Sequence, residues 1–269
     1  MSAPALRCLG REGIVTVAPQ SPAALVPTYN NADVIGALLR RVRSYIREIL
    51  VVDDGSLDGT ADEALAAGAR VVRLARNEGK AAAIRAGLAV LLGEPWSHVL
   101  MLDGDGQHDP TDIPAFMEAA SEADFVLGNR LWKPAAVPRK RSWTNFIGTR
   151  ALELMSGYPL EDSQCGFRLV EAGFLRRMGL VANRYAVDTE ILVRSGKLRA
   201  RFAHVPIQVI YDGVPSHYMA VRDTVHIVFS AVRFKVDEGD LRDDPGAEAW
   251  RRSVAVPPVL VPPAQPADR

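Results

Sequence analysis

Short apolar runs alternate with segments of helical periodicity through the first half of the chain. The apolar runs predict strands at residues 23–26, 49–52, 70–74, 98–102 and 124–127. The periodic segments between them predict helices around residues 34–42, 60–67, 80–92 and 112–120. The strands are continuously apolar rather than alternating, so each is expected to be buried on both faces. This pattern predicts an α/β fold with a mostly parallel central sheet and helices on both faces.

Polar residues gather where the predicted strands end. The strand ends carry, in chain order, Tyr29-Asn30, Asp53-Asp54, Asn77, Asp103 with Asp105, and Gly128-Asn129-Arg130. In open parallel sheets, ligands bind beyond the carboxyl ends of the strands. The sequence therefore predicts a ligand site along this edge of the sheet.

The Asp-Gly-Asp-Gly-Gln segment after the fourth strand has the chemistry of a cation site. Asp103 and Asp105 are two positions apart, and Gln107 adds a third oxygen donor. Hard oxygen ligands of this kind suit Mg²⁺ or Mn²⁺, which would bridge to substrate phosphates. Gly104 allows the backbone to approach a ligand closely. The alternative is a polar turn in which Asp103 and Asp109 cap the next helix.

Two further motifs have both a functional and a purely structural interpretation. Asp53-Asp54-Gly55-Ser56 could accept hydrogen bonds from a nucleobase or ribose, but turn and capping chemistry explains it better when it is taken alone. Asn77-Glu78-Gly79-Lys80 lacks the full P-loop spacing, and helix entry explains Gly79, while Lys80 could serve a diphosphate. No Gly-x-Gly-x-x-Gly follows the first strand, which disfavours a classical dinucleotide-binding fold. The histidines lack the spacing of zinc ligands.

Composition narrows the class of protein. The 269 residues include 32 Lys and Arg against 32 Asp and Glu, and a net charge of zero argues against a nucleic-acid binder. Two cysteines, Cys8 and Cys165, cannot form a disulfide framework, which favours a reducing compartment. We find no signal-peptide pattern and no apolar stretch of about 20 residues, the length that a transmembrane helix needs. A cytoplasmic location is expected.

The pattern loosens after residue 130. Residues 130–150 contain six basic residues and no acidic one, which favours contact with anions such as a diphosphate, an acceptor phosphate or acidic lipid headgroups over a merely solvated loop. Residues 221–236 have the periodicity of an amphipathic helix that could lie on a membrane surface. We therefore expect peripheral contact with the inner face of a membrane. Residues 1–21 are expected to be a flexible extension, residues 213–240 to contain the amphipathic helix, and residues 241–269 to be a disordered Pro-rich tail.

Five motifs in this order carry a resemblance to a known family. They are Pro27–Asn30, Val51–Ser56, Asn77–Lys80, Leu102–His108 and Gly128–Arg130, and the segments Asp162–Arg168 and Asp188–Glu190 extend the match. The chain resembles the family 2 glycosyltransferases of the GT-A fold, in the branch of dolichol-phosphate mannosyltransferases and polyprenyl-phosphate glucosyltransferases. The resemblance covers about residues 22–212 and implies one GT-A domain with a Rossmann-like nucleotide-binding half.

The resemblance also implies roles for individual residues. The nucleotide-sugar would be bound by Pro27, Tyr29, Asn31, Val52, Asp54, Lys80, Asp103, Gly104 and Arg130. The divalent cation would be held by Asp103, Asp105 and Gln107. The acceptor would be bound by Gln164, Arg168, Ser216 and His217. The catalytic residues would be Asp105, Arg130 and Asp162.

The implied activity is metal-dependent, inverting transfer of a sugar from a nucleoside-diphosphate sugar, of the GDP-mannose or UDP-glucose type, to polyprenyl phosphate or another lipid. A phosphate acceptor needs no general base, whereas a hydroxyl acceptor would need one, and Asp162 is the nearest candidate. The sequence departs from the branch where an Arg and, six residues later, a Lys hold the acceptor phosphate, because Tyr211 and His217 stand there instead. A hydroxyl acceptor therefore stays open.

Two other classes fit the residues less well. A phosphatase-like hydrolase would carry its Asp-x-Asp after the first strand, whereas here it follows the fourth. A nucleotide-sugar binder without catalytic activity is the second alternative, and the intact set of Asp103, Asp105 and Gln107 argues against it. The sequence leaves the donor sugar and the oligomeric state open.

Overall fold

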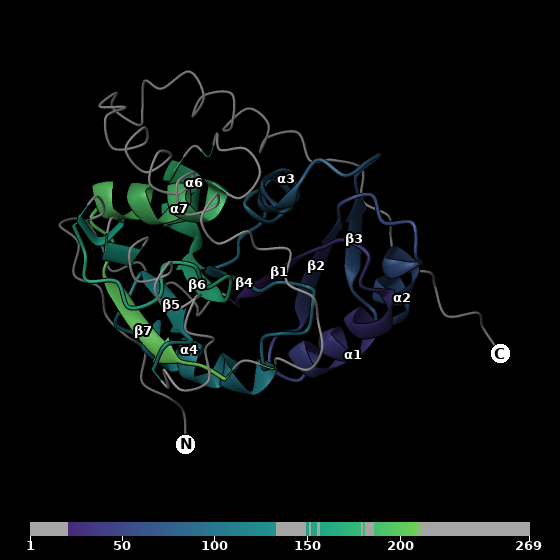
Figure 1. Cartoon of the computed structure of the whole chain (residues 1–269), viewed down its shortest axis with the longest axis horizontal. Coiled ribbons are helices and arrows are strands. Elements are labelled where there is room, and N and C mark those ends of the chain that lie inside the picture. The colour runs from purple at the N-terminus through teal and green to yellow at the C-terminus, as the bar shows by residue number, and fades with distance from the viewer. Residues whose placement is uncertain are drawn as a thin grey trace.

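A seven-stranded sheet lies between two layers of helices in the computed structural model (Figure 1). It describes residues 21–132, 149–150, 152–154, 157–178, 180, 186–208 and 210. The strands are β1 (Ala23–Thr28), β2 (Glu48–Asp53), β3 (Arg70–Arg73), β4 (His98–Met101), β5 (Phe125–Asn129), β6 (Arg168–Glu171) and β7 (Phe202–Pro206). The helices are α1 (Ala32–Arg43), α2 (Thr60–Ala66), α3 (Lys80–Leu91), the 3₁₀ helix η1 (Pro110–Asp112), α4 (Ile113–Ala119), α6 (Ala172–Met178) and α7 (Ala186–Lys197). Helices α1, α2 and α4 cover one face of the sheet, and α3, α6 and α7 cover the other.

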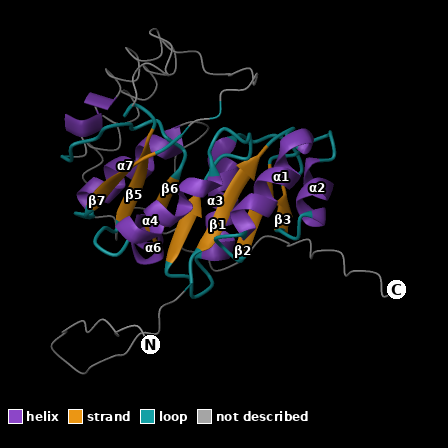
Figure 2. Cartoon of the chain, turned by 90° about the horizontal axis from the view of Figure 1, so that it is seen from below, coloured by secondary structure: helices purple, strands orange, loops and turns teal. Residues whose placement is uncertain are grey.

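The strand order is β3-β2-β1-β4-β6-β5-β7, and Figure 2 shows the strands side by side across the molecule. All neighbouring pairs are parallel except those of β6, which runs antiparallel between β4 and β5. The predicted mostly parallel α/β fold is therefore confirmed. Strand β6 was not predicted, because only two of its four residues, Arg-Leu-Val-Glu, are apolar.

The predicted end of the first strand at Pro27 was wrong, because β1 continues through Pro27 to Thr28. Strand β4 pairs with β1 only as far as Leu25. The carbonyl of Pro27 points to the β4 side, where it accepts a hydrogen bond from the backbone N–H of Gly104. Because the N–H and C=O positions of a strand residue point to the same side, the missing N–H of Pro27 also faces the β4 side, beyond the last residue of β1 that pairs with β4.

Helix α3 packs unusually close to the sheet. A Cβ on Gly87 would lie 2.2 Å from Cδ1 of Leu25 and 2.9 Å from Cγ2 of Val52, so only glycine permits this approach. Most of the helix is buried, in keeping with its Ala-rich sequence. The close packing fixes the N-terminus of α3, and with it Lys80, at the carboxyl edge of the sheet.

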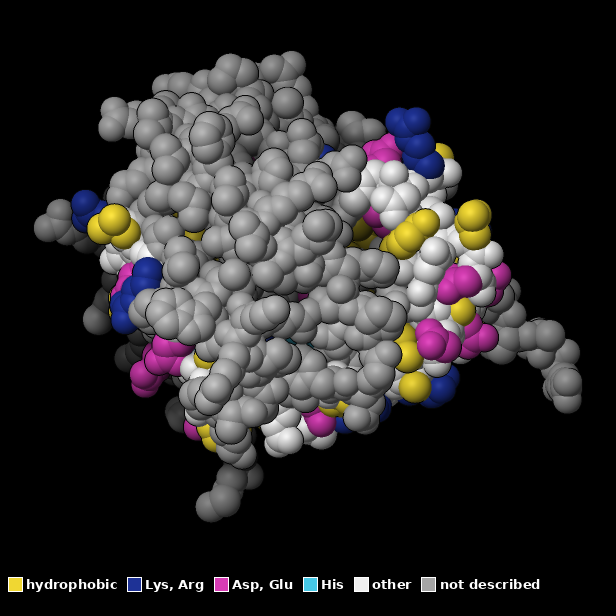
Figure 3. All heavy atoms as spheres, in the orientation of Figure 1, with side chains coloured by type: hydrophobic (Ala, Val, Ile, Leu, Met, Phe, Trp, Pro, Cys, Tyr) yellow, Lys and Arg dark blue, Asp and Glu magenta, His cyan; other side chains and the backbone are white. Residues whose placement is uncertain are grey.

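Several expectations fall outside the described residues: the N-terminal extension up to residue 20, most of the basic segment (133–148), the helix expected at 221–236, the tail from 241, and the positions of Tyr211, Ser216 and His217. Among the residues that are described, no helix has the length and apolar character needed to cross a membrane. Figure 3 shows basic and acidic side chains interspersed over the described part of the visible face rather than gathered by sign.

Candidate functional site

The loops that follow β1, β2 and β3 are joined by hydrogen bonds centred on Asp54. The backbone N–H of Asp54 donates to the carbonyl of Thr28 (2.9 Å). Its carboxylate, which is buried, accepts from the backbone N–H groups of Glu78 and Gly79, each at 2.8 Å. Asp54 therefore holds the turn that leads into α3 and Lys80. The role predicted for Asp54 at the nucleotide stays a prediction.

The β1–α1 loop is fastened to the β2–α2 loop in the same way. Asn30 has a positive φ of 53°, its backbone N–H donates to Ser56 Oγ (2.8 Å), and its side-chain oxygen accepts from the N–H of Leu57 (3.1 Å). The side-chain amide of Asn31 donates to Thr28 Oγ1 (2.9 Å), so Asn31 is engaged within the loop. Tyr29 is exposed at the same edge, where a ring could stack on a nucleobase.

Three residues predicted to contact the nucleotide, Pro27, Val52 and Gly104, also take part in packing within the fold. Val52 is fully buried under α3, and Pro27 is buried in β1, so both side chains lie beneath the edge rather than on it. The Gly104 Cα faces Thr28, and a Cβ there would lie 2.7 Å from the Thr28 side chain. Because the Val52 side chain has no exposed surface, its predicted place at the nucleotide stays a prediction.

Four charged side chains form a continuous chain at the centre of the edge. The Lys80 ammonium lies 2.8 Å from Asp103 Oδ1 and 3.2 Å from Asp188 Oδ2. The second oxygen of Asp188 lies 2.8 Å from the guanidinium of Arg168. We call Lys80, Asp103, Asp188 and Arg168 the Lys80 cluster. It links α3, the end of β4, α7 and the start of β6.

The charges of the Lys80 cluster stabilise one another. Burial opposes the charge on Lys80, but Asp103 and Asp188 outweigh it and raise the pKa of the ammonium. Burial likewise opposes the charge on Asp103, yet Lys80 and then His108 hold the pKa of that carboxyl far below its ordinary value. Both side chains are therefore ionised at neutral pH.

Asp105 lies in a less favourable environment. Burial, and then the negative charge of Asp103, raise the pKa of its carboxyl. One oxygen accepts from the backbone N–H of Gln107 (3.0 Å). Asp105 is thus a third carboxyl group near Asp103 and Asp188, in a cluster whose basic side chains are Lys80 and Arg168.

The carboxyl and amide oxygens of this turn are donors of the kind that a divalent cation prefers. In the described part of the chain, no three acidic, histidine or cysteine side chains converge as a metal cage would require. Mg²⁺ commonly uses only one or two carboxylates and completes its shell with water and substrate phosphates. Asp103, Asp105 and the amide of Gln107 suit that mode of binding.

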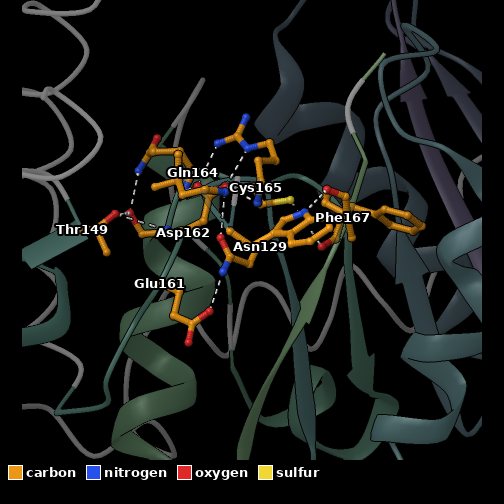
Figure 4. Close-up of polar contacts among 12 residues, drawn as sticks. Asn129, Thr149, Glu161, Asp162, Gln164, Cys165 and Phe167 are labelled. Carbon is orange, nitrogen blue, oxygen red and sulfur yellow. Dashed lines mark hydrogen bonds and ion pairs between the residues drawn. The ribbon is translucent and has the colours of Figure 1, made fainter. Parts of the chain in front are cut away.

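Arg130 and Asp162 form a second ion pair beside β5. Arg130 Nε and Nη2 lie 2.7 and 2.9 Å from the two oxygens of Asp162, and the Arg130 backbone N–H adds a third bond at 3.1 Å. Asp162 has no exposed surface and lies among Gln164, Cys165 and Asn129 (Figure 4). Burial opposes the ionisation of Asp162, but the charge of Arg130 and these hydrogen bonds outweigh burial and lower the pKa of Asp162. A carboxylate with a lowered pKa is a weak base, and the predicted role of Asp162 as a general base stays a prediction.

Of the predicted acceptor residues, the structure describes Gln164 and Arg168. Arg168 is 1% exposed, and its Nη2 donates to the carbonyl of Cys165 (2.7 Å) as well as contacting Asp188. Arg168 is thus an internal counter-ion of Asp188, and its predicted role at the acceptor stays a prediction. Gln164 is partly exposed and donates to Ser163 Oγ (3.2 Å).

No role was predicted for Asp188, although the segment Asp188–Glu190 extends the family resemblance. An acidic residue in the first turn of a helix is ordinary capping chemistry, so nothing in the local sequence sets it apart. Only the tertiary structure shows that Asp188 meets both Lys80 and Arg168, which are distant in the sequence.

Several proteins with named activities are similar to this chain in sequence. The family model of glycosyl transferase family 2 matches residues 23–179. Glycosyltransferase AglJ of Haloferax volcanii is 32% identical over 76% of this chain and 69% of its own length. The undecaprenyl-phosphate mannosyltransferase of Micrococcus luteus is 31% identical over 69% of this chain and 82% of its own.

Solved structures share the fold. The glucosyl-3-phosphoglycerate synthase of Mycobacterium tuberculosis, in complex with uridine diphosphate, superposes with a TM-score of 0.65 at 18% identity, covering 81% of this chain and 80% of the other. A second structure of that enzyme, with Mn²⁺, uridine diphosphate and glucosyl-3-phosphoglycerate, gives a TM-score of 0.62 at 16% identity over 81% and 79%. With the family model covering more than half of the sequence, the chain belongs to glycosyl transferase family 2 and has its GT-A fold.

Proposed function

We propose that this protein is a metal-dependent, inverting glycosyltransferase that moves a sugar from a nucleoside-diphosphate sugar to a polyprenyl phosphate. The observation that carries the proposal is the position of Asp103, Asp105 and Lys80 together at the carboxyl edge of β4. The acceptor class is supported by relatives such as the undecaprenyl-phosphate mannosyltransferase and the polyprenol monophosphomannose synthase. We expect a donor of the GDP-mannose or UDP-glucose type.

Acidic and basic side chains of the site would have different roles. Asp103, Asp105 and Gln107 would hold Mg²⁺ or Mn²⁺, which would offset the charge that develops on the departing diphosphate. Arg130 is held in orientation by Asp162 while part of its side chain stays exposed, so it can meet a phosphate of the donor or acceptor. Tyr29 is the exposed ring at the edge and is our candidate for contact with the base.

The state of Asp162 favours a phosphate over a hydroxyl acceptor. A hydroxyl must lose its proton during attack, and a general base for that step needs a pKa near the working pH. The lowered pKa of Asp162 and its three bonds to Arg130 make it a weak base. A phosphate is already an anion and attacks the anomeric carbon from the face opposite the diphosphate without such a base.

The test is transfer of labelled sugar to undecaprenyl phosphate in detergent micelles, with GDP-mannose and UDP-glucose as donors and Mn²⁺ or Mg²⁺ as the cation. We expect Asp105→Asn to lower kcat/KM by about 100-fold or more, the scale of losing one preorganised electrostatic contact. Asp109→Asn is the matched control, because Asp109 follows the same turn but pairs outward with Arg41. Full activity of Asp105→Asn, or of wild type in excess EDTA, would refute the metal role, and labelling of a hydroxyl lipid alone would refute the acceptor class.

A further inference from the structure

The Lys80 ammonium is shared between two carboxylates rather than assigned to one. Its distances to Asp103 and Asp188 differ by only 0.4 Å, being 2.8 and 3.2 Å. A lysine ammonium is a compact charge on a flexible stem, so it can change partner without backbone movement. Asp103, one of its two partners, is also one of the predicted ligands of the divalent cation.

Each of the two carboxylates has a neighbour besides Lys80. The second oxygen of Asp188 is fixed by Arg168, which is buried and bonded to the Cys165 carbonyl. Asp103 packs directly against Gly166, where a Cβ would lie 2.4 Å from Asp103 Oδ2. The backbone at Lys80 is set by the bonds from Glu78 and Gly79 to Asp54. Of the side chains in the Lys80 cluster, Lys80 is therefore the one that can change partner by rotation of its flexible stem.

From this arrangement we infer that Lys80 competes with the divalent cation for Asp103, and that Asp188 is the alternative partner to which the Lys80 ammonium turns when the cation binds. The inference rests on the cation site of the proposed function. It makes Asp188 a positioning residue, since it acts on the cation only through Lys80. Lys80 would thereby keep Asp103 neutralised until a cation arrives, and would remain beside the diphosphate afterwards.

Competition predicts opposite signs for two charge deletions. Lys80→Met removes the competitor, so the nucleotide-free protein should bind Mn²⁺ more tightly, by roughly tenfold, which equals about 1.4 kcal/mol. Asp188→Asn removes the alternative partner and confines Lys80 to Asp103, so Mn²⁺ should bind more weakly by a similar factor. Both affinities are measured by titration of Mn²⁺ followed by electron paramagnetic resonance of the free ion, with no sugar transfer involved.

The double variant separates partner exchange from a simple field effect. If Asp188 acts through Lys80, then Asp188→Asn should change Mn²⁺ affinity by less than about twofold in the Lys80→Met background, because coupled residues are not additive. If Asp188 acts only as a distant negative charge, its removal should weaken binding equally in both backgrounds. Additive effects would overturn the inference, and so would weaker binding by Lys80→Met alone.

Three controls keep these outcomes interpretable. Arg40→Met removes one positive charge from the exposed side of α1 and should leave the affinity unchanged. Lys80→Arg keeps the positive charge and should not bind Mn²⁺ more tightly than wild type does. This comparison can still be made if thermal unfolding shows that Lys80→Met folds poorly. Wild type that binds no Mn²⁺, or Asp105→Asn that binds as wild type does, would refute the cation site itself rather than the competition.

Discussion

The carboxyl edge of the sheet contains two ion-pair centres that differ in how firmly their charges are placed. In the Arg130–Asp162 pair, two guanidinium nitrogens meet two carboxylate oxygens of a residue with no exposed surface. In the Lys80 cluster, one ammonium serves two carboxylates whose side chains are 30% and 17% exposed. The first arrangement has one favourable geometry, whereas the second has at least two.

The difference follows from the side chains that each centre uses. Arginine presents a planar set of donors that matches a carboxylate in a bidentate way, which adds geometric specificity to the attraction. Lysine presents a point charge whose three donors can be distributed among several acceptors. We infer that a bidentate pair positions a residue for one task, and that a shared ammonium permits charges to be redistributed as substrate and cation arrive.

The largest effect is expected where the paired geometry is broken. Asp162→Ala removes the buried, bidentate partner of Arg130, so the free energy of unfolding should fall by about 3–5 kcal/mol. Equilibrium urea unfolding measures the change. Glu153→Ala, which removes a partly exposed partner of Arg150, should cost no more than about 1 kcal/mol. If both variants lose equally little stability, the Arg130–Asp162 pair contributes no more to the free energy of unfolding than an exposed ion pair does.

A smaller effect should depend on pH. Asp162→Asn keeps the shape but loses the charge, and it should cost about 1.5–3 kcal/mol near neutral pH, the value of hydrogen bonds to a charged group. The pKa of Asp162 is lowered in the fold, so the stability it adds is complete above its ordinary value of 3.8. This contribution is lost as the pH falls through the lower pKa of the folded state. Stability curves of the two proteins should thus converge below pH 3.8, and a constant difference there would contradict the assignment.

The smallest expected effect is a gain of stability, and it concerns Asp105, which lies beside the Lys80 cluster. Burial and the negative charge of Asp103 raise the pKa of Asp105, so the fold disfavours its charge, and Asp105→Asn should raise the stability of the metal-free protein by about 0.5–2 kcal/mol. Thermal unfolding in EDTA measures this gain. Excess Mn²⁺ should then stabilise wild type but not the variant. A variant that is less stable than wild type in EDTA would show that the two carboxylates do not repel.

The sequence predicted the first half of the fold well, for a physical reason. Strands β1 and β2 are central and buried on both faces, and continuous apolar runs are the direct consequence. Strand β6 is short and begins and ends with charged residues, so no periodicity identified it. Its Arg168 is buried only because Asp188 and the Cys165 carbonyl supply partners from elsewhere in the chain.

The site was predictable in its location but not in its pairing. The positions of Asp103, Asp105 and Arg130 at strand ends follow from the pattern of a parallel sheet. Nothing local shows that Asp162 pairs with Arg130, or that Lys80 reaches Asp188, because these contacts join distant segments. Val52 illustrates the converse, since a residue next to a functional motif turned out to be packed under α3.

The antiparallel insertion of β6 has a consequence for how the protein is made. Strand β4 gains its second neighbour only when β6 has left the ribosome, long after β1 has paired with its other side. At about 5–20 residues per second, the nascent chain spends several seconds with the edge of β4 uncovered. An uncovered apolar edge is a template for pairing with other chains. Chaperone demand and aggregation during synthesis should therefore concentrate on chains interrupted between β4 and β6.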